Sequence, residues 1–579
     1  MHAQPRIEDL ALISDKNTCA IIDKNATVHW YCPERFDSEA VMSSLLDVKK
    51  GGYWSVAFAD ATYVKRYFGE HDSYLRTIFS IGEEQVAVTD CMPVGTAWKG
   101  ILRVFSSSSK GLTSKLKLSA GYGEQSDQLM RITENTVYFQ RSKLYLHSAA
   151  QLTIVDHETV VLTVIPEQDC WALLTTSAEI PTKADIAIML AHTADYWSEI
   201  GRHFSYQGLF HQQVHDSLRA IQQLSCGKTG GVLAAATTSL PEVLGGERNY
   251  DYRYVWVRDT ALITGALSVL DGEIRAEYKF LDFLSKAMEK NPDKCVYPLY
   301  TIDHETIDHL TELDLRGYDD SRPVQIGNIA AEQLQLDAAA SVLIACQMIY
   351  QKYNDTPHWP LIRKITNFIS KNWQQPDNGI WEEGKELHYT AGKVFSARAL
   401  EMMSRYSDDP AEISYWLEQA DCIRMFVREK CMTKDGAFAN YAGSQDVDVS
   451  AALFSIWGYC EANSPEMIAT ASHLERSYQK SNLYWRSLVE FDSQQEGAFL
   501  AGTCWMAHHY AIAGDFNKSE QILHAVAACS TDLGYFSEEY DPVNKIMLGN
   551  FDQTFVHSSF ICAANGLTCE MKGIRTVVR

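Results

Sequence analysis

The hydrophobic pattern of this 579-residue chain changes period near residue 185, and that change limits the folds open to it. Before this point, short β-branched and aromatic segments are separated by turn residues, and several alternate apolar and polar side chains. Beyond it, apolar residues recur every three to four positions, as in amphipathic helices. The pattern predicts an antiparallel β-sandwich followed by a helical domain. The predicted strands lie within 19–32, 85–94, 101–107, 136–147 and 159–166.

The linkers between the predicted helices alternate in length. They are short after each even-numbered helix and long after each odd-numbered one, so helices joined by tight turns run antiparallel and all long linkers emerge at one end. This arrangement describes an (α/α)₆ barrel, and long loops in a compact domain usually carry function. The twelve predicted helices are 207–226, 259–270, 273–289, 328–352, 357–374, 390–406, 410–430, 446–461, 465–478, 498–513, 515–529 and 553–567.

Chain length also favours more than one domain. We therefore expect an α+β multidomain protein with three parts. They are an N-terminal antiparallel β-sandwich over 1–183, a linker helix over 184–206, and an (α/α)₆ barrel over 207–579.

The charge and cysteine content narrow the classes of partner. The formal net charge is −23, which disfavours nucleic acid and anionic membranes as partners. No run of about 18 apolar residues is present, and the N-terminus lacks a secretory signal pattern. We expect a cytoplasmic protein, with signal-free export left open. The 14 cysteines form no CxxC pair, so we expect reduced core residues and neither a metal nor a cofactor.

The first long linker carries an aromatic repeat that ends at two charged residues. Tyr252, Tyr254 and Trp256 alternate, and Arg258 and Asp259 follow where a helix is predicted to begin. An aspartate at that point is also typical of an N-cap. In the functional interpretation, Asp259 accepts from sugar hydroxyls, Arg258 donates to them, and an aromatic face covers the ring.

Two pairs of adjacent glutamates lie in two other long linkers. Glu382 and Glu383 follow Trp381, which would give Glu382 the apolar wall that suits a general acid. The second pair starts at Glu538. Two such pairs at one barrel mouth suit glycoside hydrolysis, in which one acid protonates the leaving oxygen and one carboxylate activates water on the opposite face.

Two arginines in the long linkers have two interpretations each. Arg316, near Asp319, Asp320 and Arg322, belongs either to a solvated ion-pair loop or to the substrate site. Arg486 is either a partner for a buried carboxylate or a sugar contact.

These motifs follow one another as six short blocks, and in this order the chain resembles glycoside hydrolase family 15, the glucoamylase-type enzymes, in its bacterial two-domain form. The blocks are 7–41, 248–259, 317–337, 379–383, 496–500 and 534–542, so the similarity covers nearly the whole chain. Val255 and Glu39 depart from the residues common in bacterial members, as does the loop after Glu382. These departures leave linkage and chain-length preference open.

The resemblance implies roles for individual residues. Glu382 takes the place of the general acid and Glu538 that of the general base. The residues that the resemblance implies for sugar binding are Tyr252, Trp256, Arg258, Asp259 and Arg486. Their place in the long linkers adds Trp381, Glu383 and Arg316 to the residues expected to bind the sugar.

We expect an inverting, exo-acting hydrolase that releases β-glucose from the non-reducing ends of soluble α-glucans or oligosaccharides. A trehalase, or an enzyme acting on isomaltose or dextran ends, would use the same catalytic pair. An alternative of another class is a non-catalytic sugar-binding or regulatory barrel, although such modules often lose a catalytic carboxylate. The sequence leaves the oligomeric state open.

Overall fold

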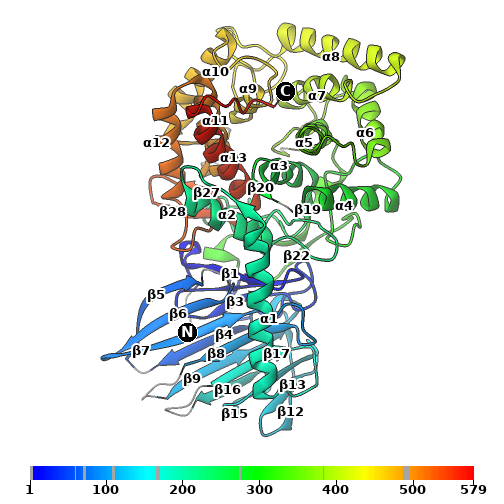
Figure 1. Cartoon of the computed structure of the whole chain (residues 1–579). Coiled ribbons are helices and arrows are strands. Elements are labelled where there is room, and N and C mark those ends of the chain that lie inside the picture. The colour runs from blue at the N-terminus through cyan, green and yellow to red at the C-terminus, as the bar shows by residue number, and fades with distance from the viewer. Residues whose placement is uncertain are drawn as a thin grey trace.

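The computed structural model describes residues 4–578 except 59, 70–72, 107–110, 165–169, 273–275, 383 and 487–495. A sandwich of two antiparallel sheets forms one end of the molecule and a ring of helices forms the other (Figure 1). This confirms the predicted fold class. Among the described residues, no helix is long and apolar enough to cross a membrane.

Each sheet of the sandwich is antiparallel throughout, and side chains from both sheets share one buried core. The alternation of apolar and polar residues along β9, for example, places Leu112, Ser114 and Leu116 inside. The first sheet has the order β1 (Ala11–Ser14), β2 (Cys19–Ile22), β3 (Val28–Tyr31), β4 (Tyr53–Phe58), β9 (Leu112–Lys117), β16 (Thr159–Val164) and β15 (Gln151–Ile154). The second has the order β12 (Leu129–Thr133), β13 (Thr136–Phe139), β14 (Leu144–Ser148), β17 (Cys170–Thr175), β8 (Gly100–Phe105), β7 (Glu84–Cys91), β6 (Leu75–Ile81) and β5 (Thr62–Phe68).

The linker helix α1 (Lys183–Arg202) begins with a capping box, in which the side chains and backbone of Thr182 and Asp185 bond to each other. Its apolar face packs Ile186 and Met189 against the second sheet, where Leu102 and Leu173 are buried. The helix therefore lies along the sandwich and leads the chain to the barrel (Figure 1).

The described part of the barrel contains twelve α-helices in two rings. Successive inner helices α3, α5, α7, α9, α11 and α13 pack on one another, and α13 closes the ring on α3. The even-numbered helices lie outside. The bounds are α2 (His211–Gln223), α3 (Val257–Ser268), α4 (Ala276–Lys290), α5 (Leu336–Tyr353), α6 (Trp359–Asn372), α7 (Thr390–Met403), α8 (Pro410–Lys430), α9 (Ala452–Ile456), α10 (Pro465–Ser477), α11 (Leu500–Ala513), α12 (Phe516–Ala527) and α13 (Thr554–Met571).

Two predicted inner helices are shorter than the sequence pattern indicates. The helix expected over 328–352 begins only at Leu336, because residues 329–332 form a separate 3-10 turn. The helix expected over 446–461 is a 3-10 turn followed by α9, and Gly458, with φ +71°, lies just beyond its end. In both places, chain expected to be helical lies in the loops at the barrel mouth.

Short strands brace these loops. β19 (Val255–Trp256) pairs with β21 (Leu299–Tyr300), and a three-stranded sheet joins β26 (Ala498–Phe499), β27 (Ser537–Asp541) and β28 (Ile546–Phe551).

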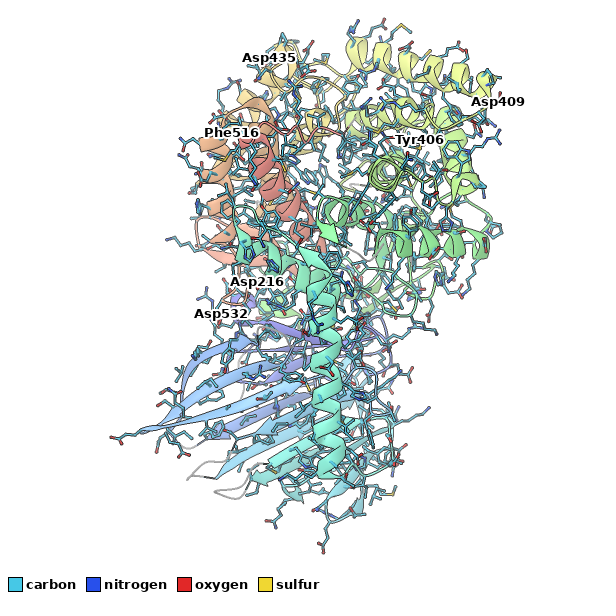
Figure 2. All side chains as sticks on the ribbon, in the orientation of Figure 1. Asp216, Tyr406, Asp409, Asp435, Phe516 and Asp532 are labelled. Carbon is cyan, nitrogen blue, oxygen red and sulfur yellow. The ribbon has the colours of Figure 1, made fainter. Side chains whose placement is uncertain are left out.

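The sandwich contacts the barrel through ion pairs and hydrogen bonds. Arg66 on β5 donates to Asp532 at 2.6 Å, and Asp532 lies where the barrel meets the sandwich (Figure 2). Lys16 reaches the backbone carbonyl of Gln222 on α2 at 2.8 Å. The boundaries of the three predicted domains stay a prediction, since both parts share one continuous core.

Candidate active site

One pocket at the mouth of the barrel gathers most of the predicted site residues. It lies at the N-terminal ends of the inner helices, where the long linkers meet. Its walls include Glu382 and Glu538 together with Tyr252, Trp256, Arg258, Asp259, Trp381 and Arg486. A larger apolar cavity of about 300 Å³ lies deeper along the same barrel, near His508 and Thr576. Neither candidate carboxylate lines that cavity, so we place the chemistry in the smaller pocket.

The aromatic repeat divides into two faces with a period of two residues. Tyr252 and Trp256 line the pocket. Asp251 and Arg253 are fully buried on the other side, where Arg253 donates to Asp251 at 2.7 Å and to the carbonyl of Ser38 in the sandwich at 3.0 Å. The sandwich therefore holds the loop that carries the pocket aromatics.

Glu382 is fixed by donors from two other loops. Its Oε1 accepts from Trp256 Nε1 at 2.9 Å and from Gln335 Nε2 at 3.0 Å, and Arg258 Nη1 lies 3.3 Å away. Glu382 has φ +60°, a left-handed backbone conformation that is uncommon outside glycine and that clusters at functional sites. These contacts hold the carboxylate in the pocket wall.

Trp381 packs within an aromatic group beside Glu382. Its ring stacks on Trp505 at 6.1 Å and meets the edge of Phe499 at 5.0 Å, while its Nε1 donates to Asp448. The predicted apolar wall is therefore present. The neighbouring Glu383, predicted to bind substrate, lies outside the described residues.

Arg258 and Asp259 form a buried pair at the start of α3. Arg258 Nε donates to Asp259 Oδ1 at 2.9 Å, and its Nη1 donates to the carbonyl of Ile380 at 2.7 Å. The N-cap of α3 is Trp256, so Asp259 lies inside the first turn and the N-cap interpretation is wrong. Burial raises the pKa of Asp259 to about 6, although the Arg258 charge partly opposes this.

Glu538 lies on β27 and is buried. Its Oε1 accepts from the hydroxyl of Tyr252 at 3.0 Å, and Arg486 Nη1 lies 3.9 Å away. Burial and the charge of Glu242 raise the pKa of Glu538 to about 8, whereas Arg486 and the Tyr252 hydroxyl lower it. A general base must be ionised, so these last two contacts favour that role. A Cβ on Gly549 would lie 2.9 Å from the Glu538 Cβ, which explains the glycine at φ +76°.

The structure separates the two arginines whose interpretation was open. Arg486 is buried and pairs with carboxylates, as one interpretation expects, and it also lines the pocket. Arg316 is not among the residues of the pocket wall. Its half-exposed side chain pairs with Asp320, and its backbone N–H donates to Asp47 of the sandwich. The position of Arg316 fits the ion-pair loop rather than the predicted substrate contact.

Several site residues were absent from the prediction. Gln335 contacts Glu382 and lies in the block 317–337, so its place in that block was the available signal. Glu242 contacts Arg486 from a loop in which no sequence pattern marks it. Phe499, Gln553 and Phe555 complete the wall and follow from the packing of loops far apart in the chain.

Two family models match this chain. The family model described as "Glycosyl hydrolases family 15" matches residues 210–565, and a model described as "Trehalase-like, N-terminal" matches residues 2–115.

Among curated relatives, a protein named Trehalase from Thermoplasma volcanium is 29% identical over 97% of this chain and 93% of its own length. Trehalase 1 of Sulfolobus acidocaldarius is 28% identical over 98% of this chain and 100% of its own length. A solved bacterial glucoamylase complexed with acarbose aligns with a TM-score of 0.74 and 12% identity, covering 100% of this chain and 96% of that one. This last likeness is one of fold.

Proposed function

Since this chain belongs to glycoside hydrolase family 15, we propose that it hydrolyses small α-glucosides by a single displacement in the pocket shared by Glu382 and Glu538. The observation that carries the proposal is that these two glutamates, from loops before α7 and α13, line one cavity. A non-catalytic barrel would have no need to keep both.

In the proposed reaction, Glu382 protonates the glycosidic oxygen while Glu538 takes a proton from the attacking water. Arg258 and Asp259 would bind the far hydroxyls of the glucose, and Tyr252 and Trp256 would pack against the ring. An inverting pair keeps its carboxyl groups roughly 6.5–9.5 Å apart to admit that water. The reaction needs neither a metal nor a cofactor, because two carboxylates and water supply all the proton transfers.

We propose α,α-trehalose as the first substrate to test. The sequence alone put α-glucan ends first and trehalose second, and the relatives reverse that order because those named trehalase align along nearly their whole length. The match of residues 2–115 to the trehalase-like model supports the same choice. The α-1,4-linked end of a soluble glucan is the second candidate, favoured by the fold shared with the bacterial glucoamylase.

The anomers released first distinguish the mechanisms. Inversion at one carbon of trehalose gives one β-glucose, while the leaving glucose keeps its α configuration, so a fresh hydrolysate should contain both anomers in equal amounts. Proton NMR during the first minutes measures this ratio. Release of α-glucose alone would indicate retention and would overturn the role of Glu538 as base.

Two amide variants test the residues themselves. Glu382→Gln and Glu538→Gln should each lower kcat by about 10²–10⁴-fold, since each removes one proton transfer. An aryl α-glucoside, whose leaving group needs little protonation, should restore part of the rate in Glu382→Gln but none in Glu538→Gln. A panel of trehalose, maltose, isomaltose, soluble starch and glycogen then ranks the substrates. Absence of hydrolysis across that panel would favour the non-catalytic alternative.

A further inference from the structure

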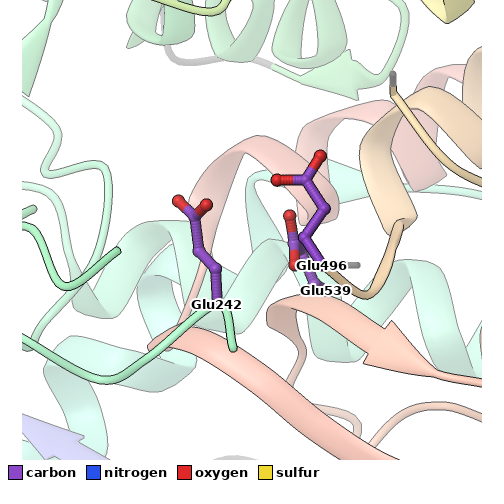
Figure 3. A group of neighbouring side chains, drawn as sticks. All are labelled: Glu242, Glu496 and Glu539. Carbon is purple, nitrogen blue, oxygen red and sulfur yellow. The ribbon is translucent and has the colours of Figure 1, made fainter. Parts of the chain in front are cut away.

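Glu538 belongs to a buried cluster of charges behind the pocket. Glu242, Glu496 and Glu539 approach one another there (Figure 3), and one carboxylate oxygen from each lies within 4.8 Å of the other two. Glu242 comes from the loop after α2, Glu496 from the loop before α11, and Glu539 from β27. All three are buried.

Arg486 occupies the centre of this cluster. Its Nε and Nη2 donate to the two oxygens of Glu496 at 2.9 and 2.7 Å, and Nη2 also donates to Glu242 at 2.6 Å. This bidentate pair of hydrogen bonds to Glu496 fixes the plane of the guanidinium group. Nη1 is then left facing Glu538 at 3.9 Å, beyond hydrogen-bonding distance but close enough for its charge to act.

A second cation, Arg248, closes the far side of the cluster. It lies 3.0 Å from Glu242 and 2.6 Å from Glu496. Because Arg486 Nη2 already lies among the three carboxylates, its positive charge stands where a metal ion would, and we propose no metal there. Four carboxyl groups face two guanidinium groups, so two of the four lack a matching cation, and the pKa values of Glu538 and Glu539 are raised by burial and by the neighbouring carboxylates.

We infer that Glu242 is a positioning residue for the proposed hydrolysis: with Glu496 it fixes Arg486 beside Glu538, and its charge sets the pH at which Glu538 becomes able to accept a proton. This inference rests on the proposed function for its meaning, but the charge effect itself can be measured without turnover.

The electrostatics of the site support this inference. The charged and titratable groups around Glu538 are Tyr252, Glu242, Arg486, Glu496 and Glu539, with Arg248 acting through its two carboxylate partners. After burial, the charge of Glu242 is the largest influence that raises the pKa of Glu538. An amide at position 242 would remove that charge while its oxygen could still accept from Arg486.

The test compares Glu242→Gln with Glu247→Gln, the same chemical change at an exposed residue of the same loop. The acidic limb of kcat/KM for trehalose should move down by about one pH unit in Glu242→Gln, with KM little changed, and should not move in Glu247→Gln. An unchanged limb, or one that moves up, would overturn the inference. Arg248→Met removes the opposing charge and should move the limb up, which keeps the test open if Glu242→Gln does not fold.

A readout without turnover separates the two proposals. With [δ-¹³C]glutamate incorporated, the Glu538 resonance is assigned by its loss in Glu538→Gln and followed across pH. Its titration midpoint should fall in Glu242→Gln and stay in Glu247→Gln. A shifted midpoint in a protein that hydrolyses no α-glucoside would leave the charge effect standing and remove the proposed function. An unshifted midpoint in an active enzyme would do the reverse.

Discussion

Replacing Tyr252 with phenylalanine removes one hydroxyl group from the site. That hydroxyl donates to Glu538 Oε1 at 3.0 Å. Among the described residues, the other oxygen of Glu538 has no hydrogen-bond partner, and Arg486 stays 3.9 Å away. The variant therefore leaves the carboxylate in its buried position without a hydrogen bond.

The size of the effect follows from this contact. A hydrogen bond to a charged group contributes about 1.5–3 kcal/mol, and about 1.36 kcal/mol corresponds to one pKa unit. Losing the hydroxyl should raise the pKa of Glu538 further above about 8, by about one to two pH units. Below its pKa, the ionised fraction of a base falls tenfold per pH unit. We therefore expect kcat/KM at pH 7 to fall by about 10–100-fold and the acidic limb to move up.

The assay is glucose release from trehalose between pH 4 and 10, with thermal unfolding to verify that each variant is folded. Tyr254→Phe is the matched control, since Tyr254 is buried in the same aromatic cluster but does not line the pocket. A folded Tyr252→Phe enzyme whose rate and pH profile match those of Tyr254→Phe would refute the reasoning.

Three further predictions concern other residues. Burial raises the pKa of Asp259 to about 6, so its carboxylate gains a proton as pH falls from 7 to 5 and KM for trehalose should rise over that range. Asp259→Asn should have a high KM that does not depend on pH in this way, and an equal pH dependence of KM in both proteins would exclude a role for Asp259 in substrate binding. Arg253→Met breaks a fully buried pair with Asp251 and should lower the free energy of unfolding by about 3–5 kcal/mol. Arg35→Met breaks a partly exposed pair with Asp303 and should lower it by less than about 1 kcal/mol. Similar unfolding midpoints for the two variants would contradict the anchoring role of Arg253. All 14 cysteines are free, so a reducing agent should leave the unfolding temperature unchanged, and a clear drop would reveal a disulfide.

The repeating features of this fold could be predicted from sequence because each helix or strand carries its own hydrophobic period. The linker alternation correctly gave the two rings of helices and the end at which the loops meet. Helix starts were less predictable. Residues 329–332 have helical composition but form a 3-10 turn, and α5 begins only at Leu336. At that start, Asp377 from another loop accepts a hydrogen bond from the backbone N–H of Leu336.

Residue types and spacing predicted the candidate site more fully than its supporting contacts. Glu382, Glu538, Trp256 and Asp259 all reach one pocket. The sequence could not decide between the two interpretations of Arg316, because Asp47, which accepts from its backbone N–H, lies in the other domain and far away in sequence. Glu242 was missed for the same reason, since its importance comes from loops that meet only in the folded chain.

The two-faced loop 248–256 has a consequence for engineering. Tyr252 and Trp256 line the cavity. Arg253 instead reaches the carbonyl of Ser38, the hydroxyl of Tyr122 and the ring of Trp30 in the sandwich. A chimera that joins this barrel to a foreign N-terminal module would leave the Arg253 guanidinium without these partners. It would therefore loosen the part of the pocket wall that Tyr252 and Trp256 form. An exchange of modules among relatives therefore has to include Ser38, Tyr122 and Trp30, the sandwich residues that contact Arg253, together with the barrel.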